Sequence, residues 1–476
     1  MTAPPLWRAL AFEAETFGAE LFALCRAVPL LDHLLCRLDE MHDPILVEDR
    51  VLRDYQRDLA VQGYFEIALP LTGAALRSGR SVILAEKTTF FGVQGRRDLL
   101  LAAARVGFAF PLCAVVLPLH RTVVTIQGTH WNVDRVAAQR ALAVFEAAGA
   151  DWSDTLAPHA LETVIVTGDA NYAHHLWNQL GALDALLAQC ARVRVLATHQ
   201  PIAPIADIFA DHPGLTVQAV PESALPRLDP LRVQPFAPGG KIVVRAVRER
   251  ILPIAARHAT RGVRHFLAQA EAQGLQLIWL SVRALGRTAT NQSDALLALG
   301  DMLLRDGRFG IVLDGYSRPH DDAGNPDYDR AAMLAALPRE QALGYQLIAG
   351  LAARHGPAVA TRIFLGIGCD LLDSIHLAAH CRAYFAHHGT LQHKIGYFTK
   401  VPGMVHSNPN ILGADPAGGH RHVTEDPGVI EYVDAALVDD VPGADGALAP
   451  NNAYRFNDIP AVVTAFADFL TRQGIR

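Results

Sequence analysis

Residues 387–394 bring together side chains that bind anions. Within this segment the predicted ligands are His387, His388, Gly389, Thr390, Gln392, His393 and Lys394. Glycine lets a backbone approach a ligand closely, and hydroxyl, imidazole and ammonium groups donate hydrogen bonds to phosphate oxygens. A solvated turn is the alternative, but three histidines, a lysine and a glutamine in eight positions favour a binding loop. The segment therefore predicts an anion site that suits a diphosphate.

A second polar cluster follows a predicted strand earlier in the chain and suits general-base chemistry. Asp169 precedes the adjacent imidazoles of His174 and His175, so a carboxylate could orient one imidazole near neutral pH. We predict these three residues as the catalytic group, with Asn171 and Asn178 on the acceptor side. A lone histidine is more often a packing residue, but an adjacent pair favours function. The pair has no third ligand at zinc spacing, so no zinc site is predicted.

Two arginines at another predicted strand end extend the anion-site hypothesis. Arg283 and Arg287 suit bidentate contacts to phosphate, although surface ion pairs are an equal alternative. Asp373 and Ser374, near the start of a predicted helix, are further candidates for contacts to the same ligand. The remaining candidates, which we assign to an acceptor region or cleft, are Tyr316, His406 and Asn408.

A group of carboxylates raises a metal-dependent alternative, a hydrolase. Its residues are Asp314, His320, Asp321 and Asp322. Such groups bind divalent cations or sugar hydroxyls, but a surface turn explains them equally well. No Asp-x-Asp pair stands at the usual strand end, so we predict no bound metal. GxGxxG after an early strand, GxxxxGK[ST] and GxSxG are also missing from the sequence.

Apolar runs before these clusters define the elements that must position them. The predicted strands are residues 162–166, 192–196, 277–281, 310–314, 361–366 and 382–386. Helical spacing of apolar residues alternates with them at residues 176–191, 293–304, 339–355 and 371–381. This alternation predicts parallel sheets with crossover helices, in which ligands bind outside the carboxyl ends of the strands. The polar clusters follow those ends.

The order of elements predicts an α/β protein with two Rossmann-like domains facing a central cleft. Residues 1–238 form the predicted N-terminal, acceptor-side domain, which includes an extra α+β region at 1–155. Residues 239–476 form the predicted C-terminal domain, after a proline-rich linker at 221–240. Further predictions are a helical stretch at 12–40, strands at 81–84, 114–117 and 121–126, a helix at 133–148 capped by Asn132, an irregular tail at 409–452 and a last helix at 459–472.

Composition excludes several classes of protein. The chain is 51% hydrophobic and 19% charged, with a net charge of −6, so nothing indicates nucleic-acid binding. Six scattered cysteines without a CxxC pair favour a reducing compartment. The first residues lack the pattern of a signal peptide, and no uncharged apolar run approaches the ~18 residues of a membrane span. We therefore expect a cytoplasmic protein without a transmembrane segment.

Three short motifs, in order along residues 160–410, resemble those of glycosyltransferase family sixty-one. They are the Asn-Tyr-Ala-His-His-Leu element at 171–176, the arginine element at 281–291, and the His-Gly-Thr-Leu loop at 388–391 with the Pro-Gly turn at 402–403. The loop is more basic here than in that family, and the first ~150 residues have no counterpart in it.

The resemblance implies a GT-B fold and an inverting glycosyltransferase that needs no bound metal or other cofactor. It implies a nucleotide-sugar donor, of which a UDP- or GDP-sugar is expected, held by the C-terminal domain. The acceptor would be a hydroxyl of a glycan, a protein or a small molecule. Two alternatives remain, namely another phosphate-ligand enzyme such as an epimerase or pyruvyl transferase, and a non-catalytic interaction protein. The sequence also leaves a homo-oligomer open.

Overall fold

The computed structural model spans residues 1–476 and falls into two compact units. The boundary between the units lies between Ile242 and Val243, except that two short segments belong to the opposite unit. Each unit is described by itself. The structure describes residues 7–12, 18–42, 49–69, 71–84, 88–103, 112–126, 133–149, 152–153, 161–240, 242–284, 286–321, 330–414, 423–442 and 452–475, without the side chains of 41–53 and 330–334.

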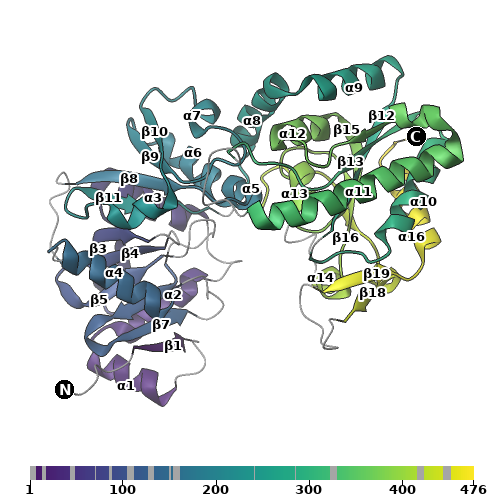
Figure 1. Ribbon diagram of the computed structural model, residues 1–476. Helices are drawn as coiled ribbons and strands as arrows, with labels where there is room; N and C mark the ends of the chain where they lie inside the picture. Colours follow the sequence, from purple (N-terminus) through teal and green to yellow (C-terminus); the bar gives the residue numbers. More distant parts are fainter. Residues whose placement is uncertain are drawn as a thin grey trace. The chain divides into compact units, whose positions relative to one another are not determined.

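The C-terminal unit is built on a six-stranded sheet in which every neighbouring pair is parallel (Figure 1). Its strands, in spatial order, are β14 (Ile363–Leu365), β13 (Phe309–Asp314), β12 (Gln276–Ser281), β15 (Cys381–His387), β16 (Gly403–His406) and β17 (Ile430–Tyr432). Numbered within the unit, this order is 3-2-1-4-5-6, the doubly wound order of a Rossmann sheet. The α/β prediction is therefore confirmed.

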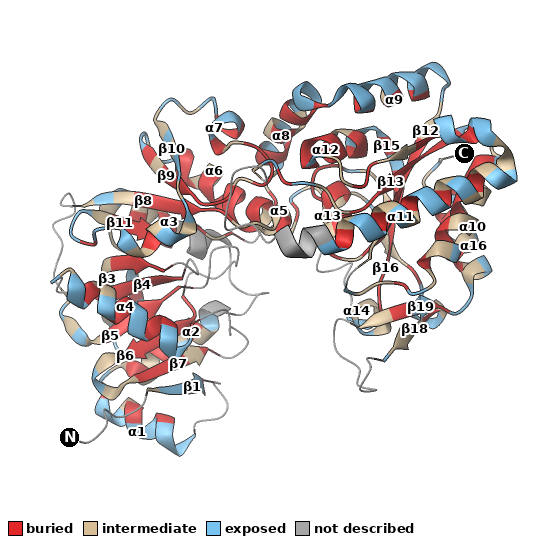
Figure 2. Cartoon of the chain, viewed as in Figure 1, coloured by how far each residue is buried: buried red, intermediate tan, exposed pale blue. Residues whose placement is uncertain are grey.

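Helices cover both faces of this sheet, which explains why its strands are continuous apolar runs. Ile278 and Leu280 of β12 share a core with α10 (Gln292–Arg305), α11 (Arg330–His355) and α16 (Ile459–Arg472). Leu277 and Trp279 point to the opposite core, with α9 (Arg261–Ala272), α12 (Leu371–His380) and α13 (Thr390–Gly396). Successive strand residues alternate between faces, so a strand buried on both sides has no polar face (Figure 2).

The N-terminal unit contains a second, four-stranded parallel sheet. Its order is β10 (Leu215–Ala219), β9 (Val193–Ala197), β8 (Glu162–Thr167) and β11 (Val233–Phe236). Within the unit this order is 3-2-1-4, so the chain reverses direction across the sheet between β8 and β11. The residues that follow β8 stand at that reversal, where ligands of doubly wound sheets bind.

A seven-stranded sheet completes the N-terminal unit. Its strands, in spatial order, are β1 (Arg8–Phe12), β7 (Thr122–Ile126), β6 (Ala114–Leu117), β5 (Arg96–Ala102), β4 (Thr89–Val93), β3 (Ala74–Ile83) and β2 (Glu66–Leu69). All pairs except β1–β7 are antiparallel. The accompanying helices are α1 (Ala19–Ala27), α2 (Leu31–His42), α3 (Asp49–Gln62) and α4 (Arg135–Ala147). Asp134 caps α4, whereas the predicted cap Asn132 lies outside the described residues.

Two segments are more regular than the sequence predicted. The expected linker at 221–240 contains the 3-10 helix η3 (Glu222–Arg227) and strand β11. The expected irregular tail at 409–452 contains α14 (Pro409–Gly413), β17, η5 (Ala435–Leu437) and β18 (Val438–Val441), and β19 (Ala453–Phe456) directly follows it. These short strands escaped prediction because their partners lie elsewhere in the chain: β11 pairs with β8 and β17 with β16.

The helix predicted at 176–191 begins earlier and changes its winding. It consists of α5 (Tyr172–His174), a π-helical segment at His175–Leu180, and α6 (Gly181–Leu187). π-Helical turns are rare and are frequently found at functional sites. Among all the residues that the structure describes, no helix is both long enough and apolar enough to cross a membrane.

Candidate functional site

The carboxyl ends of β12 and β15 meet at the point where the C-terminal sheet reverses its order. Ser281 ends β12 and His387 ends β15. The Ser281 hydroxyl oxygen accepts the backbone N–H of His387 at 2.9 Å and lies 3.1 Å from its Nδ1. These bonds fasten the two strand ends together, so the residues that follow them must leave the sheet side by side.

Those residues are the two predicted arginines and part of the anion-binding loop predicted at residues 387–394. Arg283 Nη1 donates to the carbonyl oxygen of His388 at 3.4 Å, and Arg287 Nη1 lies 3.3 Å from His388 Nδ1. Gly389 has φ 98° and ψ −147°, a conformation suited to glycine. A Cβ built on Gly389 would lie 3.0 Å from Arg287 Nη2. The structure therefore brings Arg283, Arg287, His388 and Gly389 together, as predicted from their strand ends.

The backbone of Arg283 and Ala284, after β12, is held in place by two residues outside the predicted site. Gln292 accepts the Arg283 N–H at 3.0 Å and donates to its carbonyl oxygen at 2.5 Å. The buried carboxylate of Glu340 accepts the N–H of Ala284 at 3.0 Å and that of Tyr316 at 2.6 Å. Glu340 thereby ties the loop after β12 to the loop after β13. Burial raises the pKa of Glu340, while these N–H groups oppose that rise.

Arg287 carries a positive charge with little compensation. Its side chain is half-buried, and the ion pairs found among the described residues give it no carboxylate partner. Burial lowers the pKa of this guanidinium, and the nearby phenol of Tyr454 opposes the shift. A partly desolvated charge without a counter-ion is unfavourable unless a ligand provides one. Arg287 is therefore the best marker of an anion site in this unit.

Two buried imidazoles stand behind the arginines. The side chains of His387 and His406 are each about 1% exposed, and their ring centroids are 4.3 Å apart. Burial, with the positive charge of Arg283, lowers the pKa of His406 to about 3. Burial, His406 and Arg283 likewise lower the pKa of His387 well below its usual value. Both rings are therefore neutral at pH 7, and His406 Nδ1 lies 2.6 Å from the hydroxyl of Tyr454.

Lys394 does not lie in the anion loop, in contrast to the prediction. Its ammonium donates to Asp314 Oδ2 at 2.7 Å, to the Gly315 carbonyl at 2.5 Å and to Ser317 Oγ at 2.8 Å. The side chain is about 1% exposed, so these three bonds use every N–H of a buried ammonium. The reason is that α13 winds Lys394 toward β13 rather than toward Gly389.

The other predicted donor ligands lie around the same sheet edge, and three of them have contacts elsewhere. Asp373 accepts the N–H of Thr260 at 2.7 Å, and Ser374 Oγ lies 2.7 Å from Ser317 Oγ. His393 stacks on Tyr397, with ring centroids 4.2 Å apart, and Gln392 is fully buried. Thr390 begins α13. The contacts of Asp373, Ser374 and His393 thus support the segments around the sheet edge.

The metal-dependent alternative finds no support in the described residues. Asp314 is committed to Lys394, and His320 is exposed. Asp322 lies outside the described residues. In the part of the chain that the structure describes, no group of three His, Cys, Asp or Glu side chains could hold a metal ion. Of the remaining candidates in this unit, Tyr316 follows β13, while Asn408 caps α14 by accepting the N–H of Ile411 at 3.2 Å.

The edge of the N-terminal parallel sheet holds the second predicted cluster. Gly168 follows β8 with φ 124°, and a Cβ there would lie 2.3 Å from the backbone nitrogen of His199. Asp169 accepts the N–H of Asn171 at 2.7 Å, and Asn171 caps α5 through the N–H of Ala173 at 3.0 Å. Asp169 therefore shapes the turn, and this bond goes to a backbone N–H and not to an imidazole, in contrast to the prediction.

Two amides orient the imidazoles instead. His174 Nδ1 lies 3.0 Å from Asn178 Oδ1, and His175 Nδ1 lies 2.9 Å from Gln179 Oε1. The other end of Asn178 donates to the Gly240 carbonyl at 2.8 Å, and Gln179 Oε1 also accepts the N–H of Gly168 at 2.8 Å. These bonds identify both amide oxygens as acceptors. Each histidine therefore carries its proton on Nδ1 and a lone pair on Nε2.

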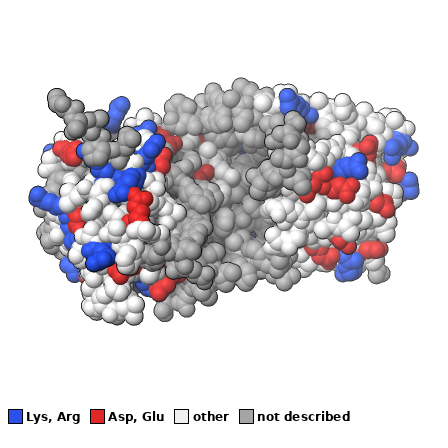
Figure 3. All heavy atoms as spheres, turned by 90° about the horizontal axis from the view of Figure 1, so that it is seen from below, with Lys and Arg blue, Asp and Glu red and all other residues white. Residues whose placement is uncertain are grey.

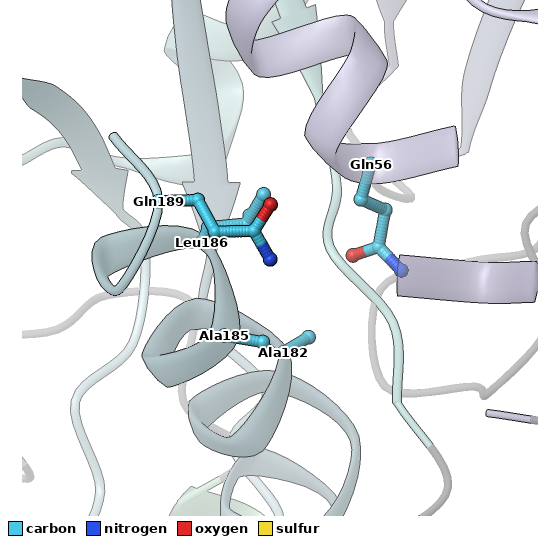
Figure 4. Close-up of a pocket in the computed structure, with 5 residues that line it drawn as sticks. All are labelled: Gln56, Ala182, Ala185, Leu186 and Gln189. Carbon is cyan, nitrogen blue, oxygen red and sulfur yellow. The ribbon is translucent and has the colours of Figure 1, made fainter. Parts of the chain in front are cut away.

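A depression in the N-terminal unit is separate from this cluster of residues. It measures about 200 Å³ and is lined by Gln56, Ala182, Ala185, Leu186 and Gln189 (Figure 4). The amide of Gln56 is already bonded to both polar groups of Gly239, at 2.6 and 2.9 Å. None of the predicted site residues lines it. In the described parts of the face that Figure 3 presents, basic and acidic side chains are interspersed.

The strand order and the polar residues at the sheet edges define a Rossmann-type α/β protein with a candidate anion site. The sequence matches no protein-family model and no curated protein. Among solved structures, it is similar to E. coli ADP-heptose LPS heptosyltransferase II, with 11% identity, a TM-score of 0.38, and coverage of 66% of this chain and 100% of that one.

Two further structures show the same level of similarity. E. coli heptosyltransferase WaaC with ADP has 12% identity and a TM-score of 0.31, over 66% of this chain and 99% of that one. The trehalose-6-phosphate synthase OtsA has 10% identity and a TM-score of 0.25, over 59% of this chain and 64% of that one. The strand order, and not these similarities, defines the fold. Membership of the family that the motifs resemble stays a prediction.

Proposed function

We propose that this chain is a glycosyltransferase that moves a sugar from a nucleotide-sugar donor to a hydroxyl acceptor. The observation that carries the proposal is the half-buried guanidinium of Arg287, which has no carboxylate partner among the described residues and lies at the reversal point of a 3-2-1-4-5-6 sheet. Nucleotides bind doubly wound sheets at this point. The diphosphate of a UDP- or GDP-sugar would supply the missing negative charge.

The donor side of the reaction uses the C-terminal unit. Arg283 and Arg287 converge on His388, and Gly389 leaves room beside the Arg287 guanidinium. In a transfer that needs no metal, these two cations neutralise the charge that grows on the diphosphate as it leaves. Lys394 has no part in this step, because its three N–H groups are bonded to Asp314, Gly315 and Ser317.

The acceptor side uses the N-terminal unit, with His174 as the base. Asn178 fixes the Nδ1 proton of His174 and so leaves the Nε2 lone pair for proton transfer. His175 has the same tautomer but is fully buried, whereas His174 is partly exposed. We therefore assign the base to His174 and a supporting role to His175.

The proposed step inverts the configuration of the sugar. His174 Nε2 takes the proton of the acceptor hydroxyl, and that oxygen forms a bond to the anomeric carbon from the face opposite the diphosphate. The bond from the anomeric carbon to the diphosphate oxygen breaks, and the diphosphate leaves with the electron pair. The products are the glycosylated acceptor and a free nucleoside diphosphate.

A binding experiment with a matched control tests the donor side. Titration calorimetry would compare UDP and GDP binding to the wild type, to Arg287→Gln and to Arg305→Gln. Arg305 is an exposed arginine of α10 paired with Asp301, so it controls for the loss of one positive charge. Hydrogen bonds to charged groups contribute about 1.5–3 kcal/mol, so Arg287→Gln should weaken binding at least about tenfold. Equal affinity of all three proteins would refute the anion site.

A turnover experiment tests the acceptor side. His174→Gln should slow release of the nucleoside diphosphate about 10²- to 10⁴-fold, the range for loss of a general base, without weakening donor binding. Product analysis separates this reaction from that of an epimerase, because an epimerase returns the sugar nucleotide intact. A wild-type protein that binds UDP-sugars and only epimerises them would overturn the transfer proposal.

A further inference from the structure

Strand β19 is attached to the segment that directly follows Arg287. Thr290 donates its N–H to the Tyr454 carbonyl at 2.7 Å, and Tyr454 donates its N–H to the Thr288 carbonyl at 3.1 Å. Asn291 adds two bonds from its side chain, because Nδ2 donates to the Phe456 carbonyl at 2.8 Å and Oδ1 accepts the Phe456 N–H at 3.0 Å. The loop that carries Arg283 and Arg287, called the arginine loop below, is therefore held by a strand far along the chain.

The side chain of the same tyrosine reaches the other half of the candidate site. Tyr454 is fully buried, and its hydroxyl lies 2.6 Å from Nδ1 of His406 on β16. The phenol has one proton, and its second contact, to the His406 carbonyl, is at 3.5 Å, the outer limit of a hydrogen bond. The proton therefore goes to Nδ1, and His406 is held as the tautomer with hydrogen on Nε2.

The hydroxyl of Ser281 contacts the imidazole of His387 in a similar way. Its hydroxyl oxygen accepts the His387 backbone N–H, and its own proton can be donated to Nδ1 at 3.1 Å. Among the described residues, neither His387 Nε2 nor His406 Nε2 has a hydrogen-bond partner, although both are buried. Two neutral imidazoles with fixed tautomers thus stand behind the arginine pair.

We propose that Tyr454 is a positioning residue for the diphosphate site. Its backbone holds the arginine loop after β12, and its hydroxyl anchors β19 to His406 at the end of β16. The role rests on the proposed function, because the loop that it positions carries the arginines of the donor side. No atom of Tyr454 needs to touch the ligand. Tyr454 acts by limiting the positions that Arg287 can take before the diphosphate arrives.

Tyr454→Phe tests the role, since it removes one oxygen atom and keeps the backbone bonds. Tyr384→Phe is the matched control, being the same change at a buried tyrosine of β15. Calorimetry with UDP and with uridine separates the phosphate contribution from that of the nucleoside. Tyr454→Phe should weaken UDP binding about tenfold and leave uridine binding unchanged, while Tyr384→Phe should change neither.

Nitrogen NMR of labelled histidines gives a second readout that needs no ligand. The wild type should show His406 protonated on Nε2, and Tyr454→Phe should turn this into a mixture of tautomers. If Tyr454→Phe does not fold, Asn291→Ala loosens the same loop from β19 and should show the same selective loss of UDP affinity. Wild-type UDP affinity in the folded variant would overturn the positioning role alone. Failure of the wild type to bind any nucleoside diphosphate would overturn the proposed function and the role with it.

Discussion

The ammonium of Lys394 lies 2.7 Å from Asp314 Oδ2, and both side chains are excluded from solvent. Burial raises the pKa of Asp314 to about 6, although the Lys394 charge acts against that rise. Removing one member of such a pair leaves the other charge buried without a partner. Neither side chain can therefore be removed alone without a cost in stability at the sheet edge on which the candidate site stands.

Lys394→Met should destabilise the protein by about 3–5 kcal/mol, the loss typical of a broken buried ion pair. The double variant Lys394→Met/Asp314→Asn should recover much of this loss, because no charge is then left alone. Urea unfolding of the two variants and the wild type measures both effects. A stable Lys394→Met that no longer binds nucleotide would show that the lysine is a ligand after all.

Gly389→Ala should affect the fold and the anion site together. A left-handed conformation of this kind costs a residue with a side chain about 1–3 kcal/mol, and the new methyl group would lie 3.0 Å from Arg287 Nη2. We expect reduced stability and, in the folded protein, weaker UDP binding. In a double-mutant cycle the binding defect should vanish on an Arg287→Gln background, because the methyl group acts through Arg287. Additive binding defects would contradict that coupling.

His406 should make stability depend on pH. Burial lowers its pKa to about 3 from the ~6.5 of an unfolded chain, so between these values the unfolded state binds more protons. The stabilisation is present above about pH 6.5 and is lost as the pH falls, by about 1.4 kcal/mol per pH unit. His406→Gln should therefore show a shallower fall in unfolding free energy between pH 6 and pH 4.

The comparison with wild type isolates this contribution. Asp314, whose pKa is raised to about 6, contributes in the opposite direction, but equally in both proteins. His258→Gln, at an exposed position of α8 (Arg245–His258), is the control and should retain the wild-type slope. Urea midpoints across this pH range provide the measurement, and identical slopes for His406→Gln and the wild type would mean that His406 is protonated in the folded state.

Gln179 should be needed for order at the acceptor side. Its Oε1 accepts from both Gly168 and His175, so Gln179→Leu removes the acceptor of two buried N–H groups and should cost about 1–3 kcal/mol. Gln179→Glu keeps an oxygen for both bonds and should fold normally. Thermal unfolding of the two variants compares them, and equal destabilisation would show that size, rather than hydrogen bonding, matters at this position.

The sequence allowed the fold class to be predicted because the strands of the C-terminal sheet are buried on both faces. The alternation of Ile278 and Leu280 with Leu277 and Trp279 leaves no polar position, and such runs are easily recognised between helices. The strand order could not be predicted, because it depends on pairing between distant segments. The short strands β11 and β17 were missed for the same reason.

Part of the candidate site could also be predicted. Arg283, Arg287, His388 and Gly389 follow strands, and the ends of parallel strands meet at one edge. Lys394 was misplaced because closeness in sequence does not fix the direction in which a helix points a side chain. Glu340 and Tyr454 carried no local signal, since they act on Ala284, 56 residues away, and on His406, 48 residues away. Gln179 did carry a local signal, because it follows His175 by four residues, the spacing of neighbours on one face of a helix.

The bonds between Asn291 and Phe456 also set the moment at which the site is completed during synthesis. The two residues are 165 positions apart, so a ribosome that adds about 5–20 residues per second makes β19 roughly 8 to 33 seconds after the arginine loop. During that interval the loop emerges without the strand that holds it. A nascent chain that already has its β12–β13–β15 core therefore still lacks the strand that holds the segment after Arg287, and the candidate anion site is complete only in the finished chain.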